Sequence, residues 1–324
     1  MTMKISSAPC CWGVDNPSNP HLPPWTRVLE EASIAGYRGI ELGPYGYLPL
    51  DVEAVGKELS RNELNVVAGT IFDDLLSGFN LESLVKQTHD ICSLITALPP
   101  LPQSSKQKKF SAPYLVIIDW GHEERDKTAG QSGKAPRLSN AQWKTMMSHI
   151  EIIADLAWQD YGVRAVVHPH AGGYIEFEDE IRQLVADISY DKVGLCLDTG
   201  HLYYSGMNPE SWLREFAERI DYVHFKDVNQ AVFEQSLADN LPFFDAVAKG
   251  VMCPIGTGIL DYDAIRQALL EIEYEGYITV EQERDPRDSD TSLRDVKASR
   301  DFLNNVGFLY WFSIYYSWSW VFKT

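Results

Sequence analysis

Short apolar runs alternate with segments of helical periodicity along nearly the whole chain, and this alternation constrains the fold more than any other feature. Four of the runs cover residues 4–12, 39–43, 65–72 and 114–120, and four more lie in RAVVHPH, VGLCLDTGH, DYVHFKDV and YITVEQE. Strands that are separated by helices pair in parallel, because each helix returns the chain to the same end of the sheet. Eight such units in 324 residues predict an α/β fold, a closed (β/α)8 TIM barrel, better than an open sheet.

Residue types at the ends of the helical segments support this interpretation. Pro24 stands near the start of the first helix, where a missing N–H costs nothing, and Gly36 ends that helix. We expect Ser139 to cap the long helix that follows the fourth strand. No glycine-rich phosphate loop follows the first strand, so dinucleotide binding gains little support.

The alternation predicts a single domain over residues 1–307, with one insertion at residues 99–113. The insertion, PPLPQSSKQKKFSAP, is rich in Pro, Ser and Lys, and strand–helix units resume directly after it, so we expect a surface loop. Residues 308–324 form an aromatic tail that is broken by Ser and is shorter than the roughly 20 apolar residues of a membrane helix. We expect this tail to lie outside the barrel, packed on its surface or at a contact between identical subunits.

Composition and cysteine usage narrow the class of protein. The formal net charge of −18 argues against nucleic acid and anionic membranes as partners, since both attract clusters of Lys and Arg. The cysteines are odd in number and lack metal-ligand spacing, and the first residues lack the apolar core of a signal peptide. We therefore expect a reducing, cytoplasmic location. Cys10 and Cys11 fall on the predicted first strand, where their side chains would face opposite ways, so a disulfide between them is not expected.

Metal-capable side chains stand at the ends of the last four predicted strands: His168, Asp198, His224 and Glu281. All strands of a parallel barrel end on one face, so residues far apart in sequence would converge there. Two imidazoles and two carboxylates suit Mn²⁺, Co²⁺, Fe²⁺ or Zn²⁺ better than Ca²⁺. The sequence therefore predicts one bound divalent cation, with Mn²⁺ or Co²⁺ as the first expectation and Zn²⁺ or Fe²⁺ as alternatives.

Other polar and aromatic residues stand at the same strand ends. They are His170, His201, Lys226 and Glu41, together with Asp119, Trp120 and Trp12. Lys226 lies two residues after the predicted ligand His224, so it points to the same side of the strand. Trp12 could form an apolar wall for a sugar ring, and Asp119 and Trp120 are candidate substrate-binding residues.

Structural explanations compete with these functional ones. Asp198 could cap the turn in LDTGH, Lys226 and Asp227 could form a solvated pair, and Glu281 could pair with Arg284. The joint pattern favours a metal site, because chance would have to place four ligand types at four consecutive strand ends.

Several stretches make the chain recognisable: AGYRGIELGPYGYLP, VVHPHAGGYIEFEDEI, LCLDTGHLYYSGMNPESWL, YVHFKDV, FFDAVAKGVMCPIGTGILDYDAI and GYITVEQERDP. Over roughly residues 5–306 the chain resembles the xylose-isomerase-like barrels, a superfamily of sugar isomerases, epimerases and apurinic endonucleases, and within it the inosose dehydratase family. The resemblance implies that the family's metal ligands fall on His168, Asp198, His224 and Glu281. Isomerase and epimerase branches commonly have Glu at the first of these positions, so His168 weakens a transfer of two-carboxylate epimerase chemistry.

The resemblance implies a metal-dependent dehydratase, a lyase that acts on a keto-polyol such as 2-keto-myo-inositol through an enediolate. Lys226, His201 and Glu41 are candidates for the base that removes the α-proton, and His170 or His201 for the acid that helps water to leave. The alternative is a divalent-metal-dependent isomerase or epimerase of ketoses or sugar phosphates, which shares the first step. Elimination from a 3-keto-glycoside, an endonuclease of the endonuclease IV type and a non-catalytic sugar-binding barrel also stay open. The net charge of −18 and the eight His argue against the endonuclease.

Overall fold

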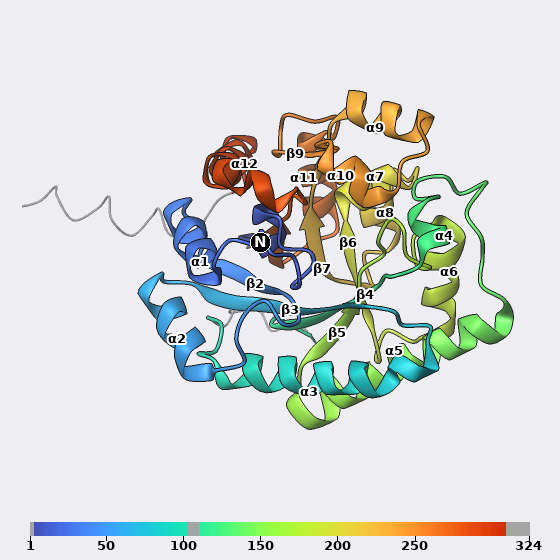
Figure 1. Cartoon of the computed structure of the whole chain (residues 1–324), viewed down its shortest axis with the longest axis horizontal. Helices are drawn as coiled ribbons and strands as arrows, with labels where there is room; N and C mark the ends of the chain where they lie inside the picture. Colours follow the sequence, from blue (N-terminus) through green and yellow to red (C-terminus); the bar gives the residue numbers. More distant parts are fainter. Residues whose placement is uncertain (1–2, 103–109, 309–324) are drawn as a thin grey trace, which may run out of the picture.

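The computed structural model describes residues 3–102 and 110–308, and within them eight parallel strands close into a barrel (Figure 1). The strands are β1 Met3–Ser7, β2 Gly39–Pro44, β3 Asn65–Asp73, β4 Tyr114–Asp119, β5 Arg164–Val167, β6 Gly194–Asp198, β7 Ile220–Phe225 and β10 Gly276–Val280. β1 pairs with β2 on one side and with β10 on the other, which closes the barrel. The predicted (β/α)8 fold is confirmed.

Helices surround the barrel because each presents an apolar stripe to the strands. The longer ones are α1 Trp25–Ile34, α2 Val52–Arg61, α3 Leu81–Ala97, α5 Asn140–Tyr161, α6 Glu178–Asp187, α9 Gln230–Ala238, α11 Tyr262–Glu271 and α12 Ser292–Val306. Shorter elements are α4 Glu123–Asp126, α7 Thr199–Tyr204, α8 Pro209–Glu215, α10 Phe243–Ala248, the strands β8 Asp227–Val228 and β9 Met252–Cys253, and the 3-10 turns η1 Pro9–Trp12, η2 Gly78–Asn80 and η3 Pro286–Thr291. Figure 1 shows α3 and α5 side by side on one flank of the barrel, and α9 and α10 above β7.

Three apolar clusters stabilise the described part of the chain, and two of them form the barrel. The larger lies between strands and helices, and a smaller one fills the barrel with side chains that include Val116, Val166, Cys196 and Tyr222. A barrel interior is packed and not a pore, so the space for a substrate must lie above the strands, at their carboxyl ends.

The predicted helix ends agree with the structure. Ser139 caps α5, since its hydroxyl accepts from Gln142 N at 3.4 Å while Gln142 Oε1 accepts from Ser139 N at 3.1 Å. Gly36, just after α1, has φ +97°, a conformation that a side chain would disfavour. These local signals are readable because capping depends on residues that are close in sequence.

The prediction that the first strand continues to Trp12 is wrong. β1 ends at Ser7, and η1 follows it. Pro9 has no N–H to donate to a sheet ladder, and Gly13 at φ +79° closes the turn, so the apolar run bends away from the barrel. Cys10 and Cys11 lie in this turn, and both are free thiols, as expected.

The insertion and the tail are only partly described. Within the insertion, Phe110 is buried and the Arg164 guanidinium carbon lies 3.7 Å from its ring centroid. Residues 103–109 and 309–324 lie outside the described residues, so the expected packing of the tail stays a prediction. Phe308, which we had assigned to the tail, is buried against Phe225 with ring centroids 5.3 Å apart. None of the described helices has the length and apolar character that a bilayer-spanning helix needs.

Candidate metal centre and active site

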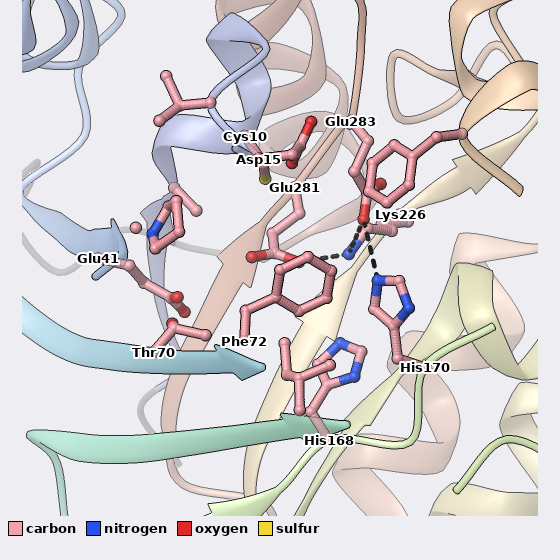
Figure 2. Close-up of a pocket in the computed structure, with 16 residues that line it drawn as sticks. Cys10, Asp15, Glu41, Thr70, Phe72, His168, His170, Lys226, Glu281 and Glu283 are labelled. Carbon is pink, nitrogen blue, oxygen red and sulfur yellow. Dashed lines mark hydrogen bonds and ion pairs between the residues drawn. The ribbon is translucent and has the colours of Figure 1, made fainter. Parts of the chain in front are cut away.

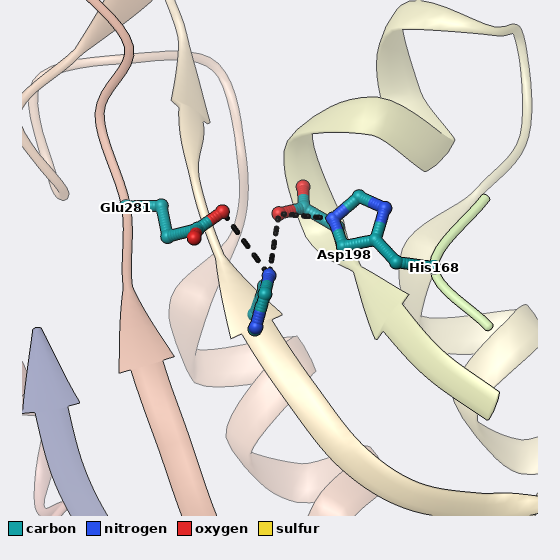
Figure 3. A group of neighbouring side chains, drawn as sticks. His168, Asp198 and Glu281 are labelled. Atoms are coloured by element: carbon teal, nitrogen blue, oxygen red, sulfur yellow. Dashed lines mark ion pairs between the residues drawn. The ribbon is translucent and has the colours of Figure 1, made fainter. Parts of the chain in front are cut away.

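The four predicted ligands converge at the carboxyl ends of adjacent strands (Figure 3). His168 directly follows β5, Asp198 ends β6, His224 lies in β7 and Glu281 directly follows β10. Asp198 and His224 are also register partners in the sheet. One ligand atom from each of the four residues lies within 4.8 Å of the ligand atoms of the other three. The strand order of the barrel therefore produces the four-ligand cluster that the sequence predicts.

The surroundings of His168 fit a metal ligand. The residue is 1% exposed, and neither ring nitrogen has a hydrogen-bond partner among the described residues. The nearest carboxylate oxygen, Asp198 Oδ2, lies 3.6 Å from Nε2, which is beyond normal hydrogen-bonding distance. Buried polar atoms without partners are rare in native proteins, and a bound cation would satisfy such a nitrogen. The N₂O₂ donor set is consistent with this explanation.

Asp198 caps a turn, as one of the two explanations from sequence expects, and its second oxygen lies in the cluster. Its Oδ1 accepts from Gly200 N at 2.8 Å and from His201 N at 2.9 Å, and so caps the start of α7. Its Oδ2 points into the cluster, 2.9 Å from Lys226 Nζ. One carboxylate therefore caps a helix with one oxygen and directs the other into the cluster.

His224 lies between two carboxylates, although neither ring nitrogen forms a hydrogen bond with a described residue. Its Nδ1 lies 3.1 Å from Glu281 Oε2, and its Nε2 lies 2.9 Å from Glu41 Oε1. Glu41 Oε1 also accepts from the Tyr222 hydroxyl at 2.6 Å. Metal-binding imidazoles commonly contact a carboxylate through the second nitrogen, which fixes the ring. Glu41 is thus placed beside a ligand as well as at the cavity.

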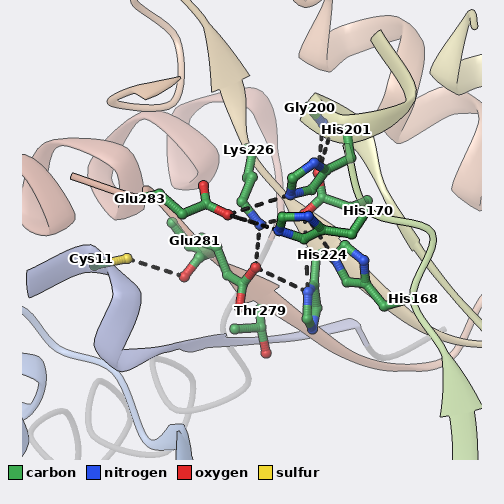
Figure 4. A network of polar contacts seen from close by, with 12 residues as sticks. Cys11, His168, His170, Gly200, His201, His224, Lys226, Thr279, Glu281 and Glu283 are labelled. Carbon is green, nitrogen blue, oxygen red and sulfur yellow. Dashed lines mark hydrogen bonds and ion pairs between the residues drawn. The ribbon is translucent and has the colours of Figure 1, made fainter. Parts of the chain in front are cut away.

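Lys226 lies at the centre of the polar network (Figure 4). Its ammonium lies 2.9 Å from Asp198 Oδ2 and 3.1 Å from Glu283 Oε1, and it also pairs with Glu281. Burial opposes its charge, but these three carboxylates raise the pKa of Lys226 well above the ordinary value. The alternative prediction, a solvated pair of Lys226 and Asp227, is wrong. Both residues are buried, and Asp227 accepts hydrogen bonds from backbone N–H groups, such as that of Gly256.

His170 and His201 are neighbours of Lys226, and their ring centroids are 3.9 Å apart. His201 Nδ1 accepts from Ala171 N at 3.1 Å, so its proton is carried by Nε2, which lies 3.3 Å from Glu283 Oε1. His170 Nδ1 donates to Ala171 O at 2.9 Å, which leaves Nε2 as the acceptor of a neutral ring. Burial is the main cause that holds the pKa of both rings well below the ordinary value.

A cavity opens directly onto the cluster (Figure 2). This inner cavity is lined by Cys10, Asp15, Glu41, Thr70, Phe72, His168, His170, Lys226, Phe244, Glu281 and Glu283, among others. An outer cavity of about 650 Å³ shares Asp15, Phe72 and Phe244 with it, so these three residues lie where the two cavities meet. A substrate would pass them on the way to the cluster.

Sequence reasoning missed Glu283, Asp15, Phe72 and Phe244. A signal for Glu283 was present: it stands two residues after Glu281, the same spacing that led us to Lys226. Asp15, in contrast, follows the unforeseen turn η1, and Phe244 lies on α10, in a long connection between β7 and β10. Sequence periodicity does not predict where such connections fold back.

Of the three predicted substrate-binding residues, only Trp120 lines a cavity. Trp120 lines the outer cavity and stacks on Phe72, with ring centroids 5.3 Å apart. Asp119 is buried and accepts from Tyr174 N at 2.6 Å and Leu75 N at 3.2 Å, so it holds loops together and does not line either cavity.

Trp12 also lies away from both cavities. It is fully buried because η1 turns it into the core, where its indole N–H donates to Glu31 Oε2 at 2.6 Å. The alternative pairing of Glu281 with Arg284 is likewise not observed, since Arg284 binds Asp295 at 2.6 Å. The prediction that Trp12 forms an apolar wall for a sugar ring is therefore wrong, because its side chain is buried in the core.

A closed (β/α)8 barrel with a four-ligand cluster and a cavity at the carboxyl ends of its strands has the layout of a barrel enzyme, since active sites of this fold lie on that face. The chain belongs to the xylose isomerase-like TIM barrel family, whose family model matches residues 29–306. The resemblance expected from the sequence is confirmed.

Comparison with individual proteins agrees with this family. The chain is 28% identical to an inosose dehydratase of Clostridium beijerinckii, over 95% of this chain and 99% of the relative. Among solved structures, the IolI protein, described with a bound zinc atom, has a TM-score of 0.68 at 16% identity and covers 94% of this chain and 98% of that one. An L-ribulose 3-epimerase has a TM-score of 0.65 at 17% identity, with 94% of each chain covered. At these identities the two structures support the fold alone.

Proposed function

We propose that the chain is a metal-dependent dehydratase, a carbon–oxygen lyase that removes water from a keto-polyol such as 2-keto-myo-inositol. The observation that carries this proposal is the buried cluster of His168, Asp198, His224 and Glu281, of which His168 and Glu281 line the inner cavity. The full-length similarity to an inosose dehydratase supports the choice of reaction.

Those four residues would hold the cation. The donor set favours Mn²⁺ or Co²⁺, with Zn²⁺ or Fe²⁺ as alternatives, because imidazole and carboxylate together suit these ions. When bound, the cation supplies stabilisation of the negative charge that develops on a ketone oxygen. The other steps belong to side chains of the chain itself.

Two of these side chains have geometry that suits proton transfer. Both contacts of Glu41 use Oε1, so we assign its Oε2 as the acceptor of the proton from the carbon next to the ketone. The Lys226 ammonium is the donor: the bond from the next carbon to its hydroxyl breaks, and that oxygen takes a proton from Nζ and leaves as water. Lys226 is thus better suited as an acid than as the base. The fixed His201 tautomer makes that residue a donor to Glu283.

His170 completes the assignment. Its Nε2, on a residue that lines the inner cavity, can accept from a substrate hydroxyl and so orient the ring of the polyol. Phe72 and Phe244 lie at the entrance and offer apolar contact to the C–H face of that ring.

The test uses 2-keto-myo-inositol with the metal-loaded protein. We expect a dione with new ultraviolet absorbance and a product lighter by one water, and loss of the reaction after chelation. In the His168→Ala variant, metal affinity and turnover should each fall by at least about 100-fold. Even the loss of a residue that only hydrogen-bonds to a metal ligand lowers metal affinity or activity about 10- to 100-fold. His89→Ala, on α3 outside the inner cavity, is the matched control.

The outcome also separates the alternative function. An isomerase or epimerase would return a product of unchanged mass and exchange the α-proton with deuterated solvent. That result would refute the dehydratase while leaving the metal centre intact. Full activity of His168→Ala with its metal retained would refute the metal centre itself.

A further inference from the structure

Glu283 is a buried carboxylate beside the cluster with no role in the steps above. It is 4% exposed and lines the inner cavity together with Glu281, two residues earlier (Figure 2). Its Oε1 lies 3.1 Å from Lys226 Nζ and 3.3 Å from His201 Nε2 (Figure 4). Both neighbours are N–H donors in this geometry, so Oε1 is fully used.

The other oxygen of Glu283 has no such partner. Oε2 is buried, and none of the residues that the structure describes forms a hydrogen bond with it. Glu41, which also lines the inner cavity, is an acceptor when ionised, and Asp15 forms no hydrogen bond with this oxygen. A buried carboxylate oxygen without a donor is costly, so this position requires an O–H or N–H group from a molecule in the cavity.

We propose that Glu283 is a specificity-determining residue, whose Oε2 accepts a hydrogen bond from one hydroxyl of a neutral polyol bound in the inner cavity. This inference rests on the proposed function and adds the class of substrate to it. The carboxylates of Glu41, Glu281 and Glu283 would repel a phosphate or carboxylate group at this position. The substrate is therefore an uncharged polyol that carries a hydroxyl there, and sugar phosphates and deoxy analogues are rejected.

Glu283→Gln tests the proposal with little change in shape. Because Lys226 and His201 both donate to the Oε1 position, the amide oxygen must occupy it. The amide NH₂ then takes the Oε2 position and presents a donor where the wild type presents an acceptor. Glu218→Gln, at an exposed position outside both cavities, makes the same change in charge and is the matched control.

The experiment measures binding and not turnover. Zinc-loaded full-length protein is titrated calorimetrically with myo-inositol, which has no ketone to react, with each monodeoxy-inositol and with myo-inositol 1-phosphate. In the wild type, one monodeoxy analogue should bind on the order of 10- to 100-fold more weakly than myo-inositol, as for a hydrogen bond to a charged group. In Glu283→Gln that difference should fall to less than about 10-fold, because a neutral amide replaces the charged acceptor and the hydroxyl can only accept from its NH₂, while Glu218→Gln keeps the wild-type difference.

Each other result overturns the inference. A wild type that binds all monodeoxy analogues equally refutes it without any variant, and so does a Glu283→Gln protein that keeps the wild-type difference. Binding of the phosphate ester as tight as that of myo-inositol refutes the neutral substrate class. If the wild type dehydrates 2-keto-myo-inositol in any of these cases, the proposed function stands and only Glu283's role fails. A wild type that binds none of the polyols and does not dehydrate 2-keto-myo-inositol overturns both.

Discussion

Two substitutions of Asp198 distinguish the roles of its two carboxylate oxygens. Asp198→Asn and Asp198→Ala should differ in stability but not in metal affinity. Asn keeps an oxygen that accepts from Gly200 N and His201 N, at 2.8 and 2.9 Å in the wild type. It places an NH₂ group where Oδ2 now lies 2.9 Å from Lys226 Nζ. Ala removes both functions at once.

The magnitudes follow from these contacts. Asp198→Asn loses one of the three carboxylate partners of a buried ammonium, which costs about 1.5–3 kcal/mol of unfolding free energy. Asp198→Ala loses the same partner and also the cap of α7, which adds about 1 kcal/mol. Both variants lack the oxygen that we propose as a ligand, so both should bind a divalent cation at least about 100-fold more weakly. Loss of a residue that only hydrogen-bonds to a metal ligand typically weakens metal binding about 10- to 100-fold.

Urea unfolding with linear extrapolation measures the stability, and competition with a chromophoric chelator measures the dissociation constant of the cation. Asp261 supplies a control pair, because it caps α11 at an exposed position by accepting from Ala264 N at 2.9 Å. Asp261→Ala should cost about 1 kcal/mol with unchanged metal affinity, and Asp261→Asn should cost less. Wild-type metal affinity in Asp198→Asn, or equal stability of the two Asp198 variants, would refute the division of labour between the oxygens.

Three further predictions concern the supporting structure. Arg125→Met should cost about 3–5 kcal/mol in urea unfolding, because it removes a fully buried guanidinium that lies 3.0 Å from Glu180 and 3.4 Å from Glu176, and among the described residues it leaves Glu180 only the part-exposed Arg137 as a cationic partner. Arg182→Met, at an exposed pair, should cost less than about 1 kcal/mol. Ser139→Ala should cost about 1 kcal/mol through loss of the α5 cap, and an unchanged urea midpoint would contradict the capping box. Burial raises the pKa of Glu176 from 4.5 to about 7, so the native state binds more protons than the unfolded state in that window, and unfolding free energy should fall by about 3 kcal/mol as pH rises through it. Unfolding at pH 5 and pH 8 checks the sign, and an increase across this window that Glu176→Gln abolishes would contradict it.

The barrel and its four-ligand cluster could be predicted from sequence because both follow from regular geometry. Apolar runs at strand spacing define the barrel, and a parallel barrel brings strand ends together whatever the loops do. His168 and Glu281 were therefore predictable as neighbours, although more than a hundred residues separate them in sequence. The same rule, applied two residues beyond Glu281 in the segment that follows β10, would have identified Glu283.

The misassigned residues depend on interactions that leave no periodic signal. Trp12 was placed on a strand because an apolar run does not distinguish a strand from a turn that packs into the core. Asp119 ends β4 as predicted, but its oxygens are taken by the backbone of distant loops, at Leu75 and Tyr174. Which strand-end residues face the cavity and which hold the loops is decided by tertiary hydrogen bonds.

The pairing of β1 with β10 has a consequence for how the chain is completed during synthesis. Met3 in β1 is the register partner of Gly276 in β10. The first strand therefore leaves the ribosome about 270 residues before the strand that pairs with one of its edges. Glu281 immediately follows that last strand. The fourth ligand is thus translated together with the segment that seals the barrel, and a nascent or truncated polypeptide that ends before it has both an open sheet edge and an incomplete coordination set.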